Sequence, residues 1–460
     1  MEVKDALKAF LDLEQEKGIY DHHIGSIVLW NLYRAPYRGR YISHAMEVRR
    51  RTKKESKWSR FHKELLYFIY SLTRLLKLLI KHEKYDNVLF SFGRLQMKEG
   101  KYFDKFTDPV IDSSTLSESY CIFQLPCVYN YKGKRRHEDR VIPIDSLYTL
   151  SYCLMPFYFV KHVFTGGCQK IYKLYSSAKQ ITPLSRKDII IMNTIYMRIR
   201  LMAIFYSFIL KRLEAKRVFY VGRRAFMDVT YSAHKLQIPV YEFQHGVTHG
   251  ETDYYSGPTC PAIDPDYFLS FGSMWKGNQF GINPQKIINI GWAYKDEILS
   301  SENETIPNSV LFISSPLITF KILKTAKGLS EKYPQFRFYI RCHPYEKYTE
   351  KQMLVINSID NLSLDDNSKD SQTALCQYEY VIGENSSVVY EALSLGKKVG
   401  RLCYNDIISA RLPDIEDDGF VYLYNDDDFS KLIAPISQTC KNEPYSDFKP
   451  EIIDSLRRKD

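Results

Sequence analysis

The segment YVIGENSSVVYEALSLGKKVGRL, Tyr380–Leu402, contains two strand patterns and a helix pattern within a short length of chain. Tyr380–Ile382 is an apolar run that stops at a glycine, as a buried strand does. Ser387–Leu395 has the apolar spacing of a helix, and Gly396 is placed to end that helix. Because Val399–Leu402 again fits a strand, the segment predicts a βαβ unit and therefore a parallel sheet.

The same alternation of strands and helices extends towards the N-terminus, and it predicts a parallel α/β architecture. The strands expected before Tyr380 are Val218–Val221, Val240–Phe243, Tyr267–Phe271, Ile287–Ile290, Val310–Ile313, Phe336–Ile340 and Leu362–Leu364, and the helices are Arg224–Leu236, Met274–Phe280, Thr319–Lys332 and Thr373–Cys376. Ser300–Ser309 is polar, contains a proline and fits a linker. We therefore expect an N-terminal α/β domain with helical insertions over residues 1–300, a C-terminal domain over 309–440, and a tail helix over 441–460.

The first part of the chain is richer in helix patterns. Ile27–Trp30 and Val88–Phe92 fit strands, while Lys57–His82 and residues 185–213 fit long amphipathic helices. Ser185 is a suitable N-cap for the second of these helices, with an aspartate three positions later. Apolar stripes of this kind usually face a protein core, and the alternative is contact with a membrane surface.

The chain has 460 residues, 45% of them hydrophobic and 26% charged, which fits a globular protein of two or three domains. Its net charge of +10 is unevenly placed, because residues 1–300 carry a balance of +16 and residues 301–460 carry −6. A basic first part predicts contact with an anionic partner, which could be a charged glycan, a lipid phosphate, a membrane surface or nucleic acid. The alternative is a solvated basic surface without a partner.

Nine cysteines occur without a CxxC pair, so we expect buried, reduced thiols and a cytoplasmic location. We expect no signal peptide, because the N-terminus lacks a basic region followed by an apolar run. No uninterrupted apolar run reaches the roughly 18 to 20 residues of a spanning helix.

Two segments of the C-terminal domain carry residues suited to binding phosphate. In YIRCHP a strand ends at Arg341, His343 and Pro344, and arginine with imidazole can hold a phosphate by charge-assisted hydrogen bonds. In GENSSVVYE, Ser386 and Ser387 begin a helix whose free N–H groups can bind an anion. Helix capping alone also explains the two serines, but the nearby arginine and histidine favour a phosphate site. The further members of this candidate donor site are Glu384, Asn385 and Glu391, the last of which could bind a ribose hydroxyl.

A histidine in the N-terminal domain is placed to act as a base. His245 follows the strand VYEF, between Gln244 and Gly246, and His249 comes shortly after. An imidazole at a strand end is suited to general-base catalysis, because its pKa lies near neutral pH. A histidine with a purely structural role is the alternative.

With these motifs the sequence resembles the GT-B glycosyltransferase-like enzymes of bacterial surface (capsular) polysaccharide synthesis. That group includes capsule sialyl- and Kdo-type transferases and the polyol-phosphate transferases of the teichoic-acid pathway. The resemblance covers roughly residues 217–425 and rests on PVYEFQHG (Pro239–Gly246), YIRCHP (Tyr339–Pro344) and GENSSVVYEALSLGKKV (Gly383–Val399). It implies two Rossmann-like domains facing a cleft. It further implies that His245 is the general base and that Arg341, His343, Ser386 and Ser387 hold the donor's phosphates.

The sequence departs from this pattern at two points that concern the donor. The acidic D/E-D/E-G motif of capsule sialyltransferases is absent from the first domain, and the one such triplet, Asp417-Asp418-Gly419, fits a turn. The tryptophan–histidine pair of the polyol-phosphate enzymes is also absent, because Gln244 precedes the histidine. Asp264-Pro265-Asp266 has the spacing of a metal-binding DxD, but it precedes a strand and fits a turn. We therefore expect neither a metal nor another cofactor.

These features together predict a metal-independent, inverting glycosyltransferase that uses a nucleotide-sugar donor and a glycan or lipid-linked acceptor. The alternatives are a polyol-phosphate transferase, an enzyme like the nucleotide-sugar 2-epimerases, and a non-catalytic protein of polysaccharide assembly. We expect no nucleic-acid partner. The expected location is the cytoplasm, with peripheral attachment at the inner face of the membrane as a further expectation.

Overall fold

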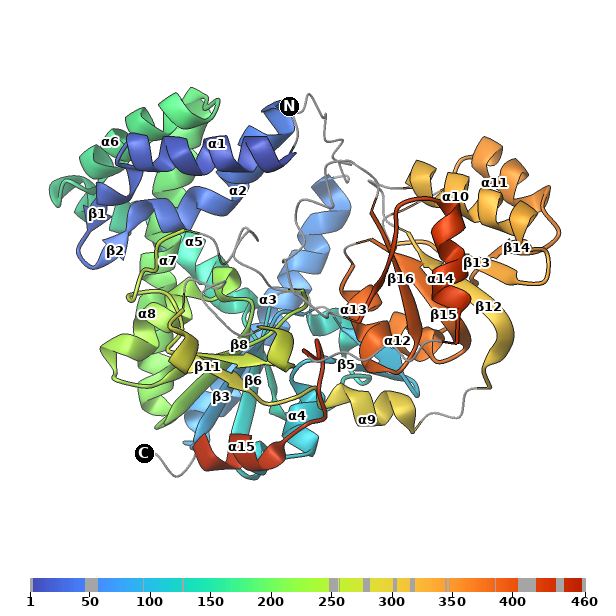
Figure 1. Cartoon of the computed structure of the whole chain (residues 1–460). Coiled ribbons are helices and arrows are strands. Elements are labelled where there is room, and N and C mark those ends of the chain that lie inside the picture. The colour runs from blue at the N-terminus through green and yellow to red at the C-terminus, as the bar shows by residue number, and fades with distance from the viewer. Residues whose placement is uncertain are drawn as a thin grey trace. The chain divides into compact units, whose positions relative to one another are not determined.

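The computed structural model describes residues 3–45, 57–93, 95–125, 128–247, 255, 257–275, 282–300, 304–314, 319–343, 346, 348–384, 386–403, 419–435 and 442–456. The chain forms two compact units, each built around one parallel sheet (Figure 1). The first unit comprises residues 1–269, 277–288 and 450–460, and the second comprises residues 270–276 and 289–449.

These boundaries differ from the predicted division into residues 1–300, 309–440 and 441–460. Trp292 belongs to the second unit, where its ring lies 4.9 Å from that of Tyr445. The C-terminal helix α15, Pro450–Ser455, packs in the first unit, where Asp454 accepts hydrogen bonds from the backbone N–H and the hydroxyl of Thr115. Packing contacts of this kind assign each segment to its unit. The sequence shows no change in composition where the chain passes from one unit to the other.

The first unit contains a seven-stranded sheet in the order β11-β10-β9-β8-β3-β6-β7. The neighbouring strands from β10 to β7 are all parallel. The strand bounds, in sheet order, are β11 Ile287–Asn289, β10 Tyr267–Ser270, β9 Val240–Phe243, β8 Arg217–Val221, β3 Asn87–Ser91, β6 Tyr120–Gln124 and β7 Val141–Pro143. Two small antiparallel hairpins accompany it: β1 His23–Ile24 with β2 Ile27–Val28, and β4 Gln96–Lys98 with β5 Lys101–Phe103.

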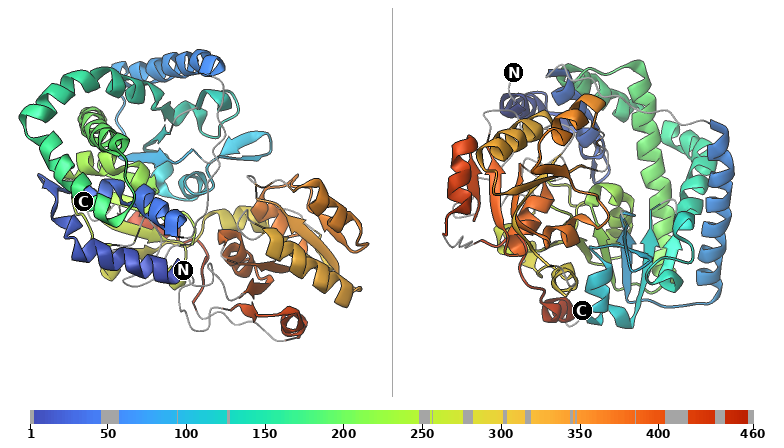
Figure 2. Two further views of the ribbon diagram at one scale, coloured as in Figure 1. Left: turned by 90° about the horizontal axis from the view of Figure 1, so that it is seen from above. Right: turned by 90° about the vertical axis from the view of Figure 1, so that its right-hand side faces the viewer.

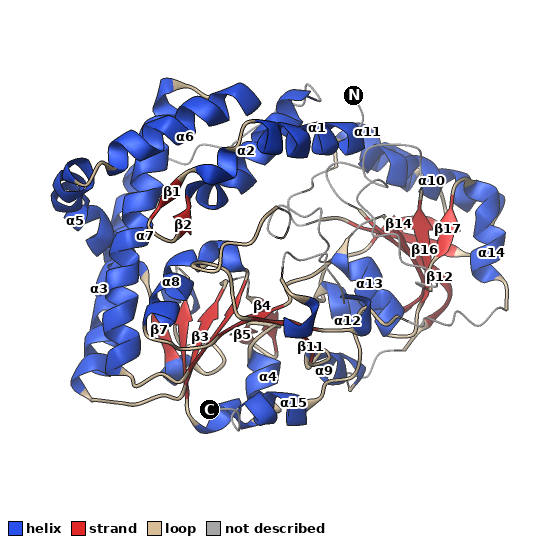
Figure 3. Cartoon of the chain, turned by 60° about the vertical axis from the view of Figure 1, so that its left-hand side comes forward, coloured by secondary structure: helices blue, strands red, loops and turns tan. Residues whose placement is uncertain are grey.

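Long helices cover one face of this sheet (Figure 3). Alternate strand residues such as Val88, Phe90, Val218 and Tyr220 bury their side chains against them. The remaining helices of the unit are α1 Val3–Glu16, α2 Leu29–Ala45, α3 Lys57–Ile80, α4 Asp108–Asp112, α5 Asp145–Phe164, α6 Gly167–Ile181, α7 Arg186–Arg212 and α8 Met227–Lys235.

Among the described residues, α7 is the one helix long and apolar enough to cross a membrane by length and composition alone. In the folded unit, however, Met192, Tyr196, Met202 and Tyr206 of α7 are buried within the protein. The predicted N-terminus of this helix is confirmed, because Ser185 and Asp188 form a capping box. Helix α7 therefore serves as a core helix along one of its sides.

The second unit contains a six-stranded parallel sheet in the order β14-β13-β12-β15-β16-β17. The strand bounds are β14 Leu362–Leu364, β13 Arg337–Arg341, β12 Ile306–Ile313, β15 Tyr378–Gly383, β16 Lys398–Leu402 and β17 Val421–Leu423. The helices are α9 Tyr294–Leu299, α10 Thr319–Lys332, α11 Glu350–Asn357, α12 Ser371–Leu375, α13 Ser387–Ser394 and α14 Phe429–Ile433. The predicted strand–helix–strand unit of Tyr380–Leu402 is thereby confirmed.

Each sheet has a point at which the strand order reverses. In the first sheet it lies between β3 and β8, and in the second between β12 and β15. Open parallel sheets bind ligands beside the carboxyl ends of the strands at such a point, because the connections leave on opposite faces there. The predicted segment GENSS directly follows β15, and the YIRCHP segment follows β13, the neighbour of β12.

Three sequence predictions of secondary structure were wrong in part. Leu29 and Trp30 begin helix α2 instead of continuing a strand. The predicted linker Ser300–Ser309 overlaps β12, which begins at Ile306 and has an irregular register with β15 near Pro307. A break in the register is where a sheet tolerates proline, since proline cannot donate to the ladder. Of the predicted helix Met274–Phe280, the described part is a 3₁₀ turn.

Two glycines with the same backbone φ of 75° provide a matched test of packing in the second unit. A Cβ at Gly291 would lie 1.9 Å from the carbonyl oxygen of Asp447, whereas a Cβ at Gly396 would meet no atom within 4 Å. Gly396→Ala should lower the free energy of unfolding by about 1 kcal/mol, the cost of a left-handed alanine. Gly291→Ala should lower it by clearly more, because backbone must move. Thermal and urea unfolding of both variants measure the difference, and equal losses would contradict the described packing.

Candidate functional site

His245 lies at the carboxyl end of β9, between two aromatic rings. The centroid of its imidazole is 5.7 Å from the Phe92 ring and 5.6 Å from the Phe106 ring. The preceding Gln244 is fully buried, and its Nε2 donates to the carbonyl of Gly246 at 2.7 Å. The turn after the strand is therefore closed by a side chain, and the half-buried imidazole is held between rings. Its predicted role as a base stays a prediction, and His249 lies outside the described residues.

A buried ion pair lies directly behind this histidine. The Nε of Arg223 donates to Glu242 at 2.7 Å, and both side chains are almost fully buried. Glu242 also accepts from the backbone N–H of Arg223 at 2.8 Å and from the Tyr255 hydroxyl at 3.1 Å. Burial alone would lower the pKa of Arg223, but the charges of Glu242 and Asp264 outweigh it and raise that pKa. Sequence reasoning missed this pair, although a glutamate inside an apolar strand was a usable signal.

A cavity of about 410 Å³ opens among α2, α5, α7 and α8 of the first unit. Its polar lining is formed by Arg198, Arg224, Asp228 and Tyr148, and its apolar lining by Leu32, Ala35, Pro36, Ile195, Ile199, Ala225 and Met227. The Arg198 guanidinium lies 5.5 Å above the centre of the Tyr148 ring. Two guanidinium groups beside an apolar wall suit an anionic group with an apolar neighbour.

Burial changes the ionisation of this cavity. It raises the pKa of Asp228 to about 7, and it lowers the pKa of Arg224 to about 10. Near neutral pH the Asp228 carboxyl is therefore divided between its neutral and charged forms. Sequence reasoning missed this cavity, because its lining comes from helices far apart in the chain.

In the second unit, Arg341 is held by its own domain. Its Nη1 donates to Asp365 at 2.5 Å and its Nη2 donates to the carbonyl of Lys369 at 2.5 Å. Asp365 also accepts from the hydroxyl of Tyr378 at 2.7 Å. These bonds fix the guanidinium at the carboxyl end of β13. Its predicted contact with a phosphate stays a prediction that would use the remaining face of the group.

Glu346 organises the loop that carries the exposed His343. It accepts from the backbone N–H of His343 at 3.0 Å, from the Ser314 hydroxyl at 2.8 Å, and from the Thr319 hydroxyl. These partners come from the loop after β13, the end of β12 and the start of α10. A single carboxylate thus ties together the loops after two adjacent strands. Sequence reasoning quoted this glutamate only as part of the motif, and Pro344 lies outside the described residues.

The GENSS segment has the predicted strand–turn–helix geometry. Ser386 is the N-cap of α13 and accepts from the backbone N–H of Val388 at 3.4 Å, so the capping explanation holds for this serine. Ser387 is the first residue of the helix and is half-buried. Because β12 lies between β13 and β15, the two candidate loops emerge roughly 10 Å apart.

Two acidic members of the predicted donor site are buried. Glu384 is 4% exposed, and Glu391 is 2% exposed. The carboxylate of Glu391 accepts from the amide Nε2 of Gln372 at 2.6 Å, within the interior of the second unit. Glu391 is therefore positioned by α12, and its predicted contact with a ribose stays a prediction. Asn385 lies outside the described residues.

The described part of the chain contains no group of three or more histidine, cysteine, aspartate or glutamate side chains that could hold a metal ion. The DxD spacing at Asp264–Asp266 occurs in a turn before β10. Asp264 accepts from the backbone N–H of Cys260 at 2.6 Å, and Asp266 accepts from that of Val240 at 2.9 Å. Asp264 therefore stabilises the turn itself, and Asp266 connects the turn to the start of β9. The triplet Asp417-Asp418-Gly419 lies largely outside the described residues.

The ionisation of Asp228 yields a prediction about stability. Its pKa is raised from about 3.8 to about 7, so the folded protein binds more protons than the unfolded chain between those values. The free energy of unfolding should therefore fall as the pH rises from 4 to 7, by a few kcal/mol. Asp228→Asn lacks the titrating carboxyl, so its free energy of unfolding should not fall in this way. Its stability relative to the wild type should therefore rise between pH 5 and pH 8.

Urea unfolding at pH 5 and pH 8 measures this relative gain. Asp188→Asn is the matched control, because Asp188 is also buried in the first unit but has a lowered pKa through hydrogen bonds from Ser185. Its stability difference from the wild type should be the same at both pH values. Equal pH profiles for the wild type and Asp228→Asn would refute the assigned ionisation.

No family model matches this sequence, and no curated protein matches it significantly. Solved structures do match. The UDP-GlcNAc 2-epimerase from Methanocaldococcus jannaschii is 12% identical with a TM-score of 0.50, over 81% of this chain and 99% of the enzyme. The Neisseria meningitidis UDP-GlcNAc 2-epimerase, solved with UDP-GlcNAc bound, is 14% identical with a TM-score of 0.47, over 81% and 100%. The wall teichoic acid polymerase TagF is 13% identical with a TM-score of 0.43, over 88% and 98%.

At this level of identity the first match bears on the fold alone. Its TM-score of 0.50 extends over nearly the whole length of the epimerase. Two parallel sheets, each flanked by helices, agree with that match. The predicted α/β fold is therefore confirmed: this chain is built from two Rossmann-like domains of the GT-B type.

Proposed function

We propose that this protein is a metal-independent, inverting glycosyltransferase that uses a nucleotide-activated sugar. The observation that carries the proposal is the placement of Ser387 at the N-terminus of α13, beside the point at which the second sheet reverses its strand order. The loop with Arg341 and His343 emerges from a strand of the same sheet. A helix N-terminus and an adjacent basic loop suit a nucleotide diphosphate.

The donor's phosphates would lie at the N-terminus of α13. There the backbone N–H groups and the Ser387 hydroxyl would donate to phosphate oxygens, and Arg341 and His343 would add positive charge. These groups are held in place before the reaction, Arg341 by Asp365 and the His343 loop by Glu346. Preorganised donors of this kind stabilise the negative charge that develops on a leaving phosphate.

His245 would act on the acceptor. Its imidazole takes the proton from an acceptor hydroxyl as that oxygen bonds to the anomeric carbon of the sugar. The bond from this carbon to the phosphate oxygen breaks, and its electron pair leaves with the nucleotide. Attack opposite the leaving group inverts the configuration at the carbon. Phe92 and Phe106 support this role, because rings on two sides restrict the orientation of the imidazole.

A nucleotide-sugar 2-epimerase is the second candidate. It is favoured by the match in fold to the Methanocaldococcus jannaschii enzyme. A polyol-phosphate transferase would use the same phosphate-binding groups, with attack at phosphorus instead of carbon. A non-catalytic assembly protein would bind nucleotide without turnover. Incubation with UDP-, GDP-, CMP- and CDP-linked donors, with products followed by NMR, separates transfer, epimerisation and mere binding.

The acceptor in this proposal is a glycan or lipid-linked glycan at the cytoplasmic face of the membrane. The net positive charge of the chain and the cavity with Arg198 and Arg224 suit an anionic acceptor. Nucleic acid has no place in the proposal.

His245→Ala should lower turnover by roughly 10²-fold or more, the usual scale for loss of a general base. The affinity for the donor nucleotide should stay nearly unchanged, because the proposed phosphate contacts come from the second unit. His234→Ala is the matched control: His234 is also a partly exposed histidine of the first unit, but it bonds to Asp266 at 3.1 Å. Steady-state kinetics and calorimetry measure both effects. Near-normal turnover of a folded His245→Ala protein would refute the assignment.

Activity should also survive excess EDTA. In the proposal, Arg341, His343 and the start of α13 take the place of a cation at the leaving phosphate. Initial rates before and after chelation are the measurement. Loss of activity that Mg²⁺ or Mn²⁺ restores would contradict the metal-independent mechanism.

A further inference from the structure

The C-terminal half of α5 exposes large apolar side chains to solvent. Phe164 is 85% exposed, Phe157 is 76% exposed and Val160 is 55% exposed. The complete set in this helix is Tyr152, Leu154, Phe157, Phe159, Val160, Val163 and Phe164. A group of this size on one helix is not a scatter of single surface residues, and it marks an interaction site.

The exposed side chains surround most of the helix. At 3.6 residues per turn they cover an arc of roughly 220°, whereas a helix packed on one side buries an arc of about 100°. Only a narrow side of this half of α5 faces its own domain. There His162 is hydrogen-bonded to Asn193 at 2.9 Å and stacks on Tyr196 at 5.1 Å.

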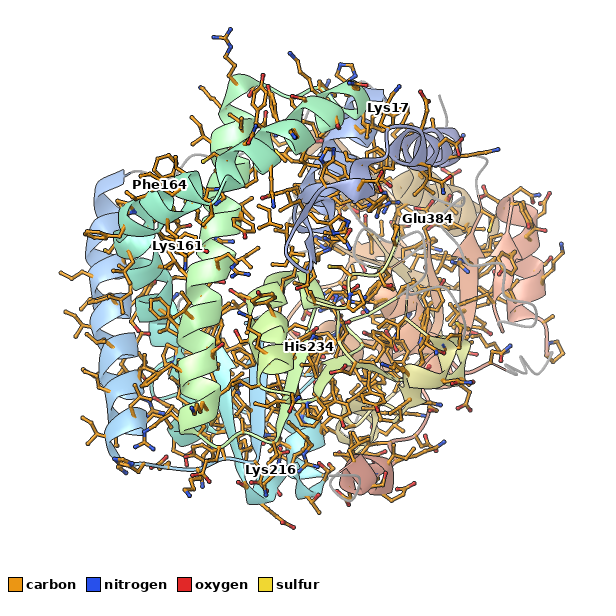
Figure 4. The ribbon with its side chains drawn as sticks, turned by 90° about the vertical axis from the view of Figure 1, so that its left-hand side faces the viewer. Lys17, Lys161, Phe164, Lys216, His234 and Glu384 are labelled. Carbon is orange, nitrogen blue, oxygen red and sulfur yellow. The ribbon has the colours of Figure 1, made fainter. Side chains whose placement is uncertain are left out.

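The helices beside α5 extend this apolar face. Ile190 and Ile191 of α7 are exposed close to the turn that contacts His162. Exposed apolar side chains also occur on α7 and on α3, whose C-terminal ends are joined where Arg212 donates to the carbonyl of Leu79. These side chains are Ile204 and Phe208 of α7, and Leu65, Leu66, Ile69, Leu76 and Ile80 of α3. Helix α5 packs beside both α3 and α7 (Figure 2). We call the exposed apolar side chains of α3, α5 and α7 the apolar face (Figure 4).

The exposed charge along α5, α6 and α7 is positive. Residues 145–212 contain ten lysines and arginines but only two acidic residues, Asp145 and Asp188, and both of these are buried. Lys161 lies within the exposed part of α5, where it projects outward together with Phe164 (Figure 4). Along α5 and α7, exposed apolar groups interspersed with basic side chains and without exposed acid match the chemistry of an anionic lipid surface, whereas α3 carries the exposed Glu64 beside Leu65.

We propose that the apolar face docks the protein on an anionic membrane leaflet, with the C-terminal half of α5 inserted among the lipid headgroups and upper acyl chains. A fluid lipid layer can enclose an arc of 220°, whereas the surface of a folded partner covers one side of a helix. Lys161 then lies at the level of the lipid phosphates. Helix α7 does not span the bilayer, since one of its sides is buried in the domain. The inference does not depend on the reaction proposed above.

The proposed docking surface coincides only in part with the basic segments of the sequence. Helix α3 contributes its exposed apolar stripe, for which the sequence left membrane contact as the alternative to core packing. The basic residues Lys132, Lys134, Arg135 and Arg136 do not all contribute to an exposed basic surface, because Arg135 is buried in an ion pair with Asp108. Helix α5 was not noticed, because its apolar residues lack the one-sided spacing that identifies an amphipathic helix.

Flotation of the full-length protein with lipid vesicles tests the proposal. The wild type should float with vesicles of phosphatidylcholine and phosphatidylglycerol, and less with phosphatidylcholine alone. Phe157→Glu/Phe164→Glu should reduce the partition coefficient at least tenfold, and Lys161→Glu should reduce only the part that depends on anionic lipid. Phe320→Glu is the matched control, because Phe320 is 78% exposed on α10 of the second unit. It should float like the wild type.

A second measurement shows which residue enters the lipid. Phe157→Trp should gain fluorescence that brominated lipids quench, and Phe320→Trp should not. Circular dichroism verifies that every variant is folded, and light scattering measures its molecular mass in solution. If the double variant still floats, the proposal is wrong. The proposal is also wrong if the wild type does not float. If the wild type is then a dimer that Phe157→Glu/Phe164→Glu converts to monomers, the apolar face binds a second copy of the chain.

Discussion

The buried ion pair between Glu242 and Arg223 is the interaction on which the carboxyl edge of the first sheet depends. Glu242 is fully enclosed and receives two donors from Arg223 and one from Tyr255. An isolated carboxylate at such depth would cost several kcal/mol, so the arginine must lie where it does. Arg223 begins the connection after β8, and His245 stands three residues after Glu242. One pair therefore positions both the loop at the strand-order reversal and the candidate base.

The second unit orders its candidate site with carboxylates in a similar way. Asp365 binds the guanidinium of Arg341, and Glu346 binds the loop of His343 together with the ends of two neighbouring elements. These carboxylates should repel the proposed phosphate little, because protein donors already hydrogen-bond to them. They fix basic groups and backbone N–H groups at the strand ends before a ligand arrives, and such preorganisation is what electrostatic catalysis requires.

The helical layer of the first unit has two distinct sides. Its inner side supplies the core, where Tyr206 of α7 lies against Phe90 of β3. Its outer side carries the apolar face of α3, α5 and α7. The cavity lined by Asp228 and Arg198 lies among the same helices and includes Tyr148 of α5. Helix α5 contributes both to this cavity and to the apolar face, so membrane docking would bring the arginines of the cavity towards the lipid surface, where a lipid-linked acceptor would be found.

The sequence by itself determined the parallel α/β architecture, most strands after residue 217, and the strand ends that carry His245, Arg341 and Ser387. These features depend on local periodicity and on glycine and serine at turns, so neighbouring residues suffice to predict them. Strands β6 and β7, the unit boundaries and the cavity around Asp228 were not predictable, because they depend on contacts between distant segments. The partners of Arg341 and Glu391, and the exposure of Phe157 and Phe164, were likewise decided only by the tertiary structure. The reason is physical: a residue's burial and its hydrogen-bond partners are set by which other elements pack beside it, and that packing leaves no mark in the residue's own stretch of sequence.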